Sequence, residues 1–284
     1  MALTFEETSR TVDTGTWTIH YNEAGDPSSP AVVLLHGSGP GATGWSNFKT
    51  NIETLAQHFR VIAPDMPGWG RSDAVTRDEM DHAKAAVQLL DALGIEKAAF
   101  VGNSMGGITT LRLATEYPER VSHVITMGPG SGPQPKLFSP AGGLSEGMKT
   151  LVAAYREPSV ESMTRLTEVM TYDSARFATP ELAAERAENA KAHPQHLANY
   201  LDGFAKGGPI AKWFRLEDLP GVDVPTLLIH GRDDRVVHYE STLLLLAHLP
   251  NSRAVLLNRC GHWAQVEHAD EFNRLVIDFV TNNN

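Results

Sequence analysis

The chain has 284 residues, a formal net charge of −10 at pH 7 and one cysteine, Cys260. Its length allows one large domain with an inserted subdomain, and its acidic balance argues against nucleic acid or an anionic membrane as a partner. A lone cysteine excludes an internal disulfide, no apolar run is long enough to cross a bilayer and the N-terminus is polar, so we expect a cytoplasmic protein without a membrane span.

Strand and helix patterns alternate through the first 127 residues. The expected strands lie at 17–21, 31–35, 60–63, 98–101 and 121–127, and helices are expected at about 45–58, at 81–93 and directly after residue 104. The apolar run at 31–35 is typical of a parallel strand that is buried on both faces. Strands that alternate with helices predict a mostly parallel sheet flanked by helices, that is, an α/β fold.

The alternation stops between residues 128 and 220. Glycine and proline cluster at 128–143, and helical patterns follow at 146–155, 159–170 and 180–191. Strands resume at 226–229 and 254–257, before a last helix at about 270–280. We therefore expect an α/β core formed by residues 1–131 and 216–284, with a helical cap formed by residues 132–215 inserted over the sheet.

A glycine-rich turn follows the strand at 98–101. It reads Gly102-Asn-Ser104-Met-Gly106 and leads directly into a helix. This G-x-S-x-G pattern between a strand and a helix is typical of a nucleophile elbow, in which a sharp turn exposes the serine. The five-letter pattern also arises by chance, so its neighbours in the fold decide its meaning. We predict that Ser104 is a nucleophile.

A serine hydroxyl needs an adjacent base, and that base needs a carboxylate to orient it. The strand at 226–229 is followed by Asp233 and Asp234, and the strand at 254–257 is followed by His262. The order serine, acid, histidine is that of the α/β-hydrolases, and loops after parallel strands meet at one edge of the sheet. We predict a triad of Ser104, Asp234 and His262, with Asp233 as a solvated or ion-paired neighbour.

The loop at 36–42 is expected to complete the site. Its Ser38 amide and the Met105 amide are the expected donors of an oxyanion hole, which stabilises the negative charge of a tetrahedral intermediate. The same loop also fits a relaxed dinucleotide-binding pattern from Gly37 to Ala42, with Asp65 as the ribose ligand. The serine, acid and histidine would have no role in such a site, which makes this alternative the weaker one.

Other reactive side chains receive structural interpretations. We expect His36 and His230 to be buried structural histidines, and His193 and His196 to be surface residues of the cap. Cys260 precedes His262 by two residues, but no elbow surrounds it, so we interpret it as a small buried apolar residue rather than a nucleophile.

Three longer strings extend these motifs: HGSGPGATGW at 36–45, GNSMGG at 102–107 and CGHWAQVEHADEFNRL at 260–275. With them the chain resembles the meta-cleavage product hydrolases, the carbon–carbon bond hydrolases of aromatic catabolism within the α/β-hydrolase superfamily. The resemblance implies hydrolysis of the C5–C6 bond of a 2-hydroxy-6-oxohexa-2,4-dienoate to a 2-hydroxypenta-2,4-dienoate and a carboxylic acid. It implies an anionic small-molecule substrate, no metal or organic cofactor, and a homo-oligomer that is a dimer or larger. A carboxylesterase or lactonase with the same triad is the alternative.

The resemblance also implies roles for substrate-binding residues. Arg186 matches the cap arginine that binds the dienoate carboxylate, and Trp263 matches an aromatic wall beside the histidine. Further expected contacts to the substrate are Asn47, Asn103, Gly37 and Gly39. His238 departs from the proline of many relatives, a difference that need not affect the chemistry. The glycine- and proline-rich segment at 128–133 is unusual and bears on the pocket for the group beyond C6, which depends on how the cap packs over the sheet and is left open.

Overall fold

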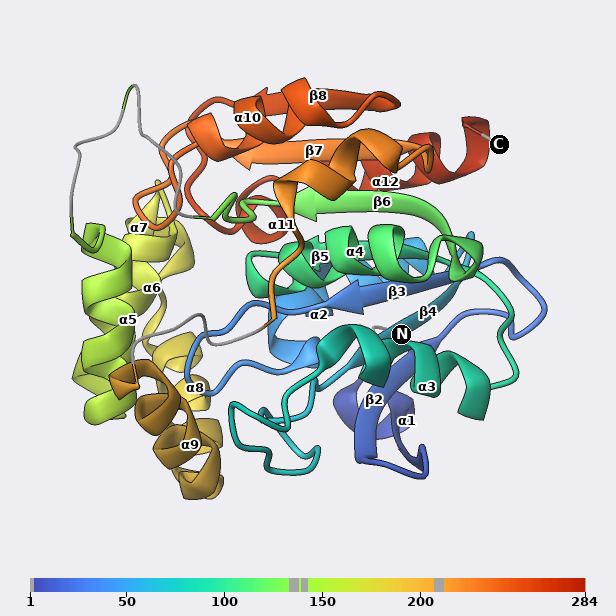
Figure 1. Cartoon of the computed structure of the whole chain (residues 1–284). Helices are drawn as coiled ribbons and strands as arrows, with labels where there is room; N and C mark the ends of the chain where they lie inside the picture. The colour runs from blue at the N-terminus through green and yellow to red at the C-terminus, as the bar shows by residue number, and fades with distance from the viewer. Residues whose placement is uncertain (1–2, 133–137, 139–142, 207–211, 284) are drawn as a thin grey trace.

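The computed structural model describes residues 3–132, 138, 143–206 and 212–283. An eight-stranded sheet in the order β1-β2-β4-β3-β5-β6-β7-β8 forms the centre of the molecule (Figure 1). The strands are β1 (Ser9–Asp13), β2 (Thr18–Ala24), β3 (Ala31–Leu35), β4 (Arg60–Pro64), β5 (Ala98–Asn103), β6 (Val121–Met127), β7 (Thr226–Gly231) and β8 (Ser252–Leu257). The β1–β2 and β2–β4 pairs are antiparallel and the remaining neighbouring pairs are parallel, which confirms the predicted mostly parallel sheet.

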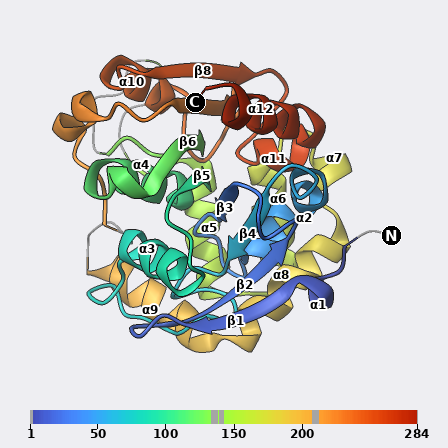
Figure 2. The same ribbon diagram turned by 90° about the vertical axis from the view of Figure 1, so that its right-hand side faces the viewer.

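Helices cover both faces of this sheet (Figure 2). On one face lie α3 (His82–Ala92) and α4 (Met105–Glu116), and on the other α2 (Gly44–Leu55) and α12 (Ala269–Asn282). Alternate residues of a strand point to opposite faces, so Val33 packs into the hydrophobic cluster of the α3–α4 side and Val32 into that of the α2–α12 side. This double burial explains why β3 is a continuous apolar run.

The described residues of the cap form five helices beside the carboxyl ends of the parallel strands (Figure 1). They are α5 (Glu146–Arg156), α6 (Val160–Met170), α7 (Ser174–Phe177), α8 (Pro180–Ala192) and α9 (Pro194–Ala205). Residues 133–137, 139–142 and 207–211 lie outside the described residues, so the predicted cap limits of 132 and 215 remain predictions.

Several elements were not predicted from the sequence. They are β1, α1 (Phe5–Thr8), α7, α9, α10 (Glu240–His248), α11 (Ala264–Glu267) and the 3-10 turns η1 (Pro118–Arg120) and η2 (Leu216–Gly221). β1 reads Ser-Arg-Thr-Val-Asp and lies mostly exposed at the edge of the sheet, so it lacks the apolar alternation that marks a half-buried strand. Within the described part of the chain, no helix has the length and apolar character that a membrane span requires.

Candidate active site

Ser104 occupies a strained turn between β5 and α4. Its φ of 53° and ψ of −111° lie in a region that residues with a side chain rarely adopt. The flanking glycines make this turn possible, because a Cβ on Gly102 would lie 2.2 Å from the Gly106 carbonyl oxygen, and one on Gly106 would lie 2.1 Å from that of Leu35. The turn has the backbone geometry expected of a nucleophile elbow and leaves Ser104 half-buried among buried neighbours.

His262 and Asp234 form a buried pair at the carboxyl edge of the sheet. His262 Nδ1 lies 2.7 Å from Asp234 Oδ2, while Asp234 Oδ1 accepts the amides of Val236 at 2.7 Å and Val237 at 2.9 Å. A carboxylate accepts hydrogen bonds and does not donate them. His262 Nδ1 therefore carries the hydrogen, and Nε2 is left unprotonated, as a general base requires.

Asp234 remains ionised in spite of its burial. Burial alone would raise the pKa of Asp234, but the imidazoles of His262 and His230 and their hydrogen bonds outweigh it and hold that pKa below its usual range. His230 Nε2 lies 3.2 Å from Asp234 Oδ2, and its Nδ1 lies 2.7 Å from Thr242 Oγ1. His230 is therefore the buried structural histidine that the sequence predicted, and it supports the acid.

Two close contacts tie the loops of the site together. Gly128, at the end of β6, lies so near the pair that an added Cβ would be 3.0 Å from His262 Nδ1 and 3.1 Å from Asp234 Oδ2. Asn103 Nδ2 donates to the carbonyl oxygens of His262 at 3.2 Å and Met127 at 3.3 Å. Asn103 is fully buried, and only its acceptor Oδ1 has no partner. A free acceptor can bind a substrate hydroxyl, which donates a hydrogen bond, but it cannot bind a carboxylate, which only accepts.

The loop after β3 is held rigidly against the elbow. His36 Nε2 accepts the Met66 amide at 2.9 Å, so its Nδ1 carries the hydrogen and donates to the Gly37 carbonyl oxygen at 2.8 Å. Burial lowers the pKa of His36, which keeps the ring neutral. The Gly37 carbonyl and the Ser38 N–H belong to one planar peptide, so His36 fixes the direction of that N–H. A Cβ on Gly37 would lie 3.4 Å from Ser104 Cβ.

Arg186 is a buried cation on α8. It is 2% exposed, its Nη2 donates to the Pro40 carbonyl oxygen at 3.2 Å, and its guanidinium lies 5.2 Å from the centre of the Trp263 ring. Gly39 makes room for it, since a Cβ there would lie 2.6 Å from Nη2. Burial lowers the pKa of Arg186 to about 10, so the group stays positive at neutral pH. Its Nε has no hydrogen-bond partner.

A cleft between the cap and the core joins three of the predicted substrate residues. Its empty space, counted out to open solvent, is about 400 Å³. The lining residues are Ser46, Asn47, Lys49, Thr50, Leu182, Arg186, Trp263, Gln265 and Val266. Gln265 was not predicted: it is fully buried, and neither atom of its amide has a partner. No sequence pattern marks such a glutamine, although it lies three residues after His262.

The remaining candidates divide into confirmed and incorrect interpretations. Cys260 is buried, and its burial raises the pKa of the thiol, as a structural residue requires. Asp233 makes an ion pair with Arg232 at 3.6 Å. The interpretation of His196 as a surface residue is wrong, because the side chain is buried and its Nε2 lies 3.1 Å from the Gly70 carbonyl oxygen. His193 stacks on it with ring centroids 5.2 Å apart.

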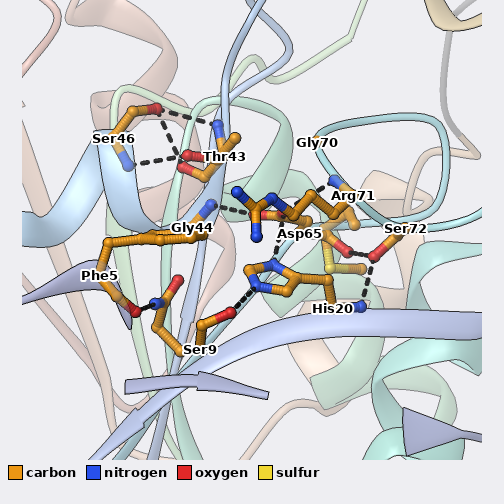
Figure 3. Close-up of polar contacts among 12 residues, drawn as sticks. Phe5, Ser9, His20, Thr43, Gly44, Ser46, Asp65, Gly70, Arg71 and Ser72 are labelled. Atoms are coloured by element: carbon orange, nitrogen blue, oxygen red, sulfur yellow. Dashed lines mark hydrogen bonds and ion pairs between the residues drawn. The ribbon is translucent and has the colours of Figure 1, made fainter. Parts of the chain in front are cut away.

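A second serine–histidine–aspartate series connects β1, β2 and the residue that follows β4 (Figure 3). Ser9 Oγ is 2.8 Å from His20 Nε2, and His20 Nδ1 is 2.8 Å from Asp65 Oδ2. Ser9 has an ordinary extended backbone with a φ of −66°. Asp65 also accepts the amides of Gly44 at 2.8 Å and Arg71 at 3.0 Å. This network is structural, and its buried aspartate cannot serve as the ribose ligand of the dinucleotide alternative.

The chain is similar to known proteins over nearly all of its length. Residues 30–269 match the family described as the alpha/beta hydrolase fold. A 2-hydroxy-6-oxo-6-phenylhexa-2,4-dienoate hydrolase from Burkholderia cepacia is 45% identical over 93% of this chain and 91% of the relative. A 2-hydroxy-6-oxononadienedioate/2-hydroxy-6-oxononatrienedioate hydrolase from Cupriavidus pinatubonensis is 43% identical over 93% and 91%. The solved structure of a meta-cleavage product hydrolase from Pseudomonas fluorescens matches with a TM-score of 0.84 and 31% identity, covering 98% of this chain and 100% of that one.

Proposed function

This chain belongs to the α/β-hydrolase fold family and, within it, to the meta-cleavage product hydrolases, and from that membership we propose how its residues cleave a carbon–carbon bond. The reaction is hydrolysis of the C5–C6 bond of a 2-hydroxy-6-oxohexa-2,4-dienoate. One water is consumed, and the products are a 2-hydroxypenta-2,4-dienoate and a carboxylic acid. The named relatives differ in the group on C6, which is phenyl in one set and ends in a carboxylate in the other.

The buried guanidinium of Arg186 supports the orientation that we assign to the substrate. A buried cation with an unpartnered donor at the wall of a cleft favours an anionic ligand, and a planar guanidinium pairs well with a carboxylate. Asn47 and Gln265 line the same cleft, and Trp263 connects it to the catalytic histidine as its neighbour in the chain. We place the C1 carboxylate of the dienoate at Arg186 and its C6 carbonyl at Ser104.

In the first half of the reaction the dienol ketonises. The 2-hydroxyl proton is lost, a proton is delivered to C5 with the help of His262, and the dienoate becomes a 2,6-dioxo intermediate. Asp234 assists by holding His262 in the tautomer whose Nε2 faces the reacting atoms. Arg186 balances the charge on the carboxylate end throughout.

In the second half Ser104 adds to the C6 carbonyl as His262 accepts its proton. The C6 oxygen takes up negative charge, which the amides of Ser38 and Met105 stabilise. Met105 opens α4, where N–H groups lack a partner within the helix. The C5–C6 bond then breaks and its electron pair leaves with the dienolate, which takes the proton held by His262 to become the 2-hydroxypenta-2,4-dienoate. With His262 neutral again, water adds to the acyl group on Ser104, His262 accepts the proton of that water, and the carboxylic acid leaves as the proton returns to Ser104.

The experiment is to mix the purified protein with the yellow 6-phenyl dienoate and, separately, with the 2-hydroxy-6-oxononadienedioate, and to follow the visible absorbance. We expect rapid bleaching with release of a carboxylic acid for at least one of them. Ser104→Ala should lower turnover at least about 1,000-fold. Near-wild-type turnover by that variant would exclude the proposed nucleophile, and no bleaching together with ready ester cleavage would favour an esterase.

Arg186→Ala tests the orientation of the substrate. Losing a charge-assisted pair in a buried site should lower kcat/KM for the dienoate by about 100-fold, while a neutral p-nitrophenyl ester should be hydrolysed within about threefold of wild type. Arg165→Ala is the matched control, because Arg165 is an exposed cap arginine paired with Glu161. An equal loss for both substrates would place the role of Arg186 in the fold rather than in carboxylate binding.

We also propose that the protein is a cytoplasmic homo-oligomer, a dimer or larger. The free, buried thiol of Cys260 is compatible with a reducing compartment. β8 lies at one end of the strand order, and Leu256 on it is exposed, as is Leu243 on the adjacent α10. An edge strand with exposed leucine offers unpaired backbone groups and apolar area to a second copy.

A further inference from the structure

Tyr155 on α5 reaches from the cap to the loop that carries Ser38. Its hydroxyl donates to the Ser38 carbonyl oxygen at 2.5 Å and accepts the indole N–H of Trp69 at 3.0 Å. An indole nitrogen can only donate, so the tyrosine O–H is directed at Ser38. Burial raises the pKa of Tyr155, so this proton is retained at neutral pH.

The ring of Tyr155 is fixed as firmly as its hydroxyl. It is 2% exposed and lies flat on the ring of Tyr200 of α9, with centroids 3.5 Å apart and an angle of 4° between the planes. Two cap helices therefore hold the side chain in place. Its hydroxyl therefore forms a direct hydrogen bond between the cap and the loop after β3.

Ser38 lies between two peptide units that are each held by a side chain. The carbonyl before it, Gly37 C=O, accepts His36 of the core, and its own carbonyl accepts Tyr155 of the cap. With both planar units fixed, φ and ψ of Ser38 have little freedom. The direction of the Ser38 N–H is thus set from the core on one side and from the cap on the other.

We propose that Tyr155 is a positioning residue that couples docking of the cap to assembly of the oxyanion hole, by fixing the Ser38 amide through the Ser38 carbonyl. This inference rests on the proposed function, in which that amide stabilises the C6 oxyanion. An oxyanion donor is effective only within a few tenths of an ångström of its place. Without the Tyr155 contact the Ser38 peptide can turn, so acylation of Ser104 depends on the cap being docked as it is here.

Tyr155→Phe tests this, since it keeps the stacked ring and removes only the hydroxyl. The burst of p-nitrophenol on acylation of Ser104 by p-nitrophenyl acetate, and single-turnover cleavage of the dienoate, should both slow about 10-fold. The dissociation constant of the dienoate, measured with Ser104→Ala in the background, should change less than twofold. The indole N–H resonance of Trp69 should shift, because its acceptor is lost.

Asn199→Ala is the matched control. Asn199 of α9 also donates from the cap to a core carbonyl, that of Val75 at 2.9 Å, but Val75 lies outside the loop after β3. Acylation should stay within twofold of wild type in this variant. Equal slowing of both variants would indicate general loosening of the cap and would overturn the proposal, as would normal acylation in Tyr155→Phe.

Two further measurements distinguish misfolding of Tyr155→Phe from failure of the proposed function. If Tyr155→Phe does not fold, Trp69→Phe removes the donor that orients the hydroxyl, and the same acylation step should slow by a smaller factor; unchanged acylation would overturn the coupling. Failure of the proposed function itself would be seen in the wild-type enzyme as intact dienoate. The ester burst would still test Tyr155 in that case.

Discussion

Asp234 is an example of a buried charge that the local backbone keeps ionised. Two amides hold one oxygen and two imidazoles approach the other, so the cost of burial is offset at each lone pair. The neighbouring Asp233 lies in a different environment: its Oδ1 pairs with Arg232 at 3.6 Å, while its buried Oδ2 has no hydrogen-bond partner. Two adjacent positions in the loop therefore hold one carboxylate in a complete set of hydrogen bonds beside His262 and leave the other with an unsatisfied oxygen.

Asp234→Asn should separate the catalytic and stabilising effects of this charge. An amide favours the wrong tautomer of His262, and we expect kcat to fall by about 10⁴. The folded pKa of Asp234 lies below the unfolded value of about 3.9. The folded state thus binds fewer protons than the unfolded chain in acid, and the carboxylate stabilises the fold above that range.

This stabilisation is lost as the pH falls through and below about 4. Thermal melts should therefore show a difference in Tm between wild type and Asp234→Asn that is largest at pH 7 and shrinks toward pH 3. Asp233→Asn, which removes the neighbouring carboxylate of the same loop, is the control variant. A Tm difference that stays constant with pH would contradict a lowered pKa for Asp234.

At the scale of elements, Gly128 shows that the residue after a strand limits the space available to the catalytic side chains. It follows β6 with a φ of 55° and faces both His262 and Asp234. Gly128→Ala would press a methyl group against the pair and displace it by a few tenths of an ångström. We expect kcat to fall about 10-fold, because a misplacement of about 1 Å can cost about 100-fold. Steady-state kinetics on the dienoate and a thermal melt measure the two effects.

Gly94→Ala separates crowding from backbone strain. Gly94 has a similar φ of 66°, and an added Cβ there would meet no atom within 4 Å. Both variants should lose a similar amount of stability from the left-handed backbone, of about 1 kcal/mol. Only Gly128→Ala should lose activity. Equal activity in the two variants would show that the pair tolerates displacement.

The elements with a clear period were predictable, and those defined by tertiary contact were not. β3 is a continuous apolar run, β5 begins with one at 98–101, and α5 and α6 follow serine N-caps, so each carries its own signal. α9 begins at Pro194 directly after α8 ends, and the sequence gives no sign that His196 will meet Gly70. Edge strand β1 is mostly polar, and its position depends on tertiary contacts: it pairs with β2, and Val12 packs against the hydrophobic cluster.

The candidate site follows the same division. Chain order and glycine spacing predicted which loops carry Ser104, Asp234 and His262, because these depend on local turns at strand ends. Gln265 and Tyr155 were not predicted, since their importance comes from what folds against them: an unfilled cleft in one case and the Ser38 carbonyl in the other. Contacts between cap and core have no signature in a single sequence.

At the scale of the whole molecule, the active site depends on two parts of the chain meeting. The loop of the catalytic histidine is bound to the cap at the end of α6: the His262 amide donates to the Met170 carbonyl oxygen at 2.7 Å. Glu267 accepts the amides of Gly261 at 2.6 Å and Tyr172 at 2.8 Å, and so joins the same two segments. Cap–core contacts therefore hold His262, the loop of Ser38 and Arg186, the residues to which we assign the roles of base, oxyanion donor and carboxylate ligand.

The outer edge of the sheet is the expected place for contact between subunits. β8 reads Ser-Arg-Ala-Val-Leu-Leu, and it carries no lysine or proline, two of the residues with which natural edge strands prevent pairing. Leu256 on this strand is 42% exposed. We expect two copies to meet along β8, which would bury this leucine and satisfy the unpaired backbone groups.

Leu256→Lys should convert the oligomer to a smaller species, because a buried, unpaired ammonium at a strand edge is costly to both partners. Size-exclusion chromatography with light scattering measures the mass, and kcat/KM on the dienoate should stay within about twofold, since every residue of the site comes from one chain. Val160→Lys is the control: it places the same charge on an exposed apolar position of the cap, 46% exposed, and should leave the mass unchanged. A monomeric wild type would show that no such interface exists. An unchanged mass for Leu256→Lys would show that the subunits meet at a surface other than β8.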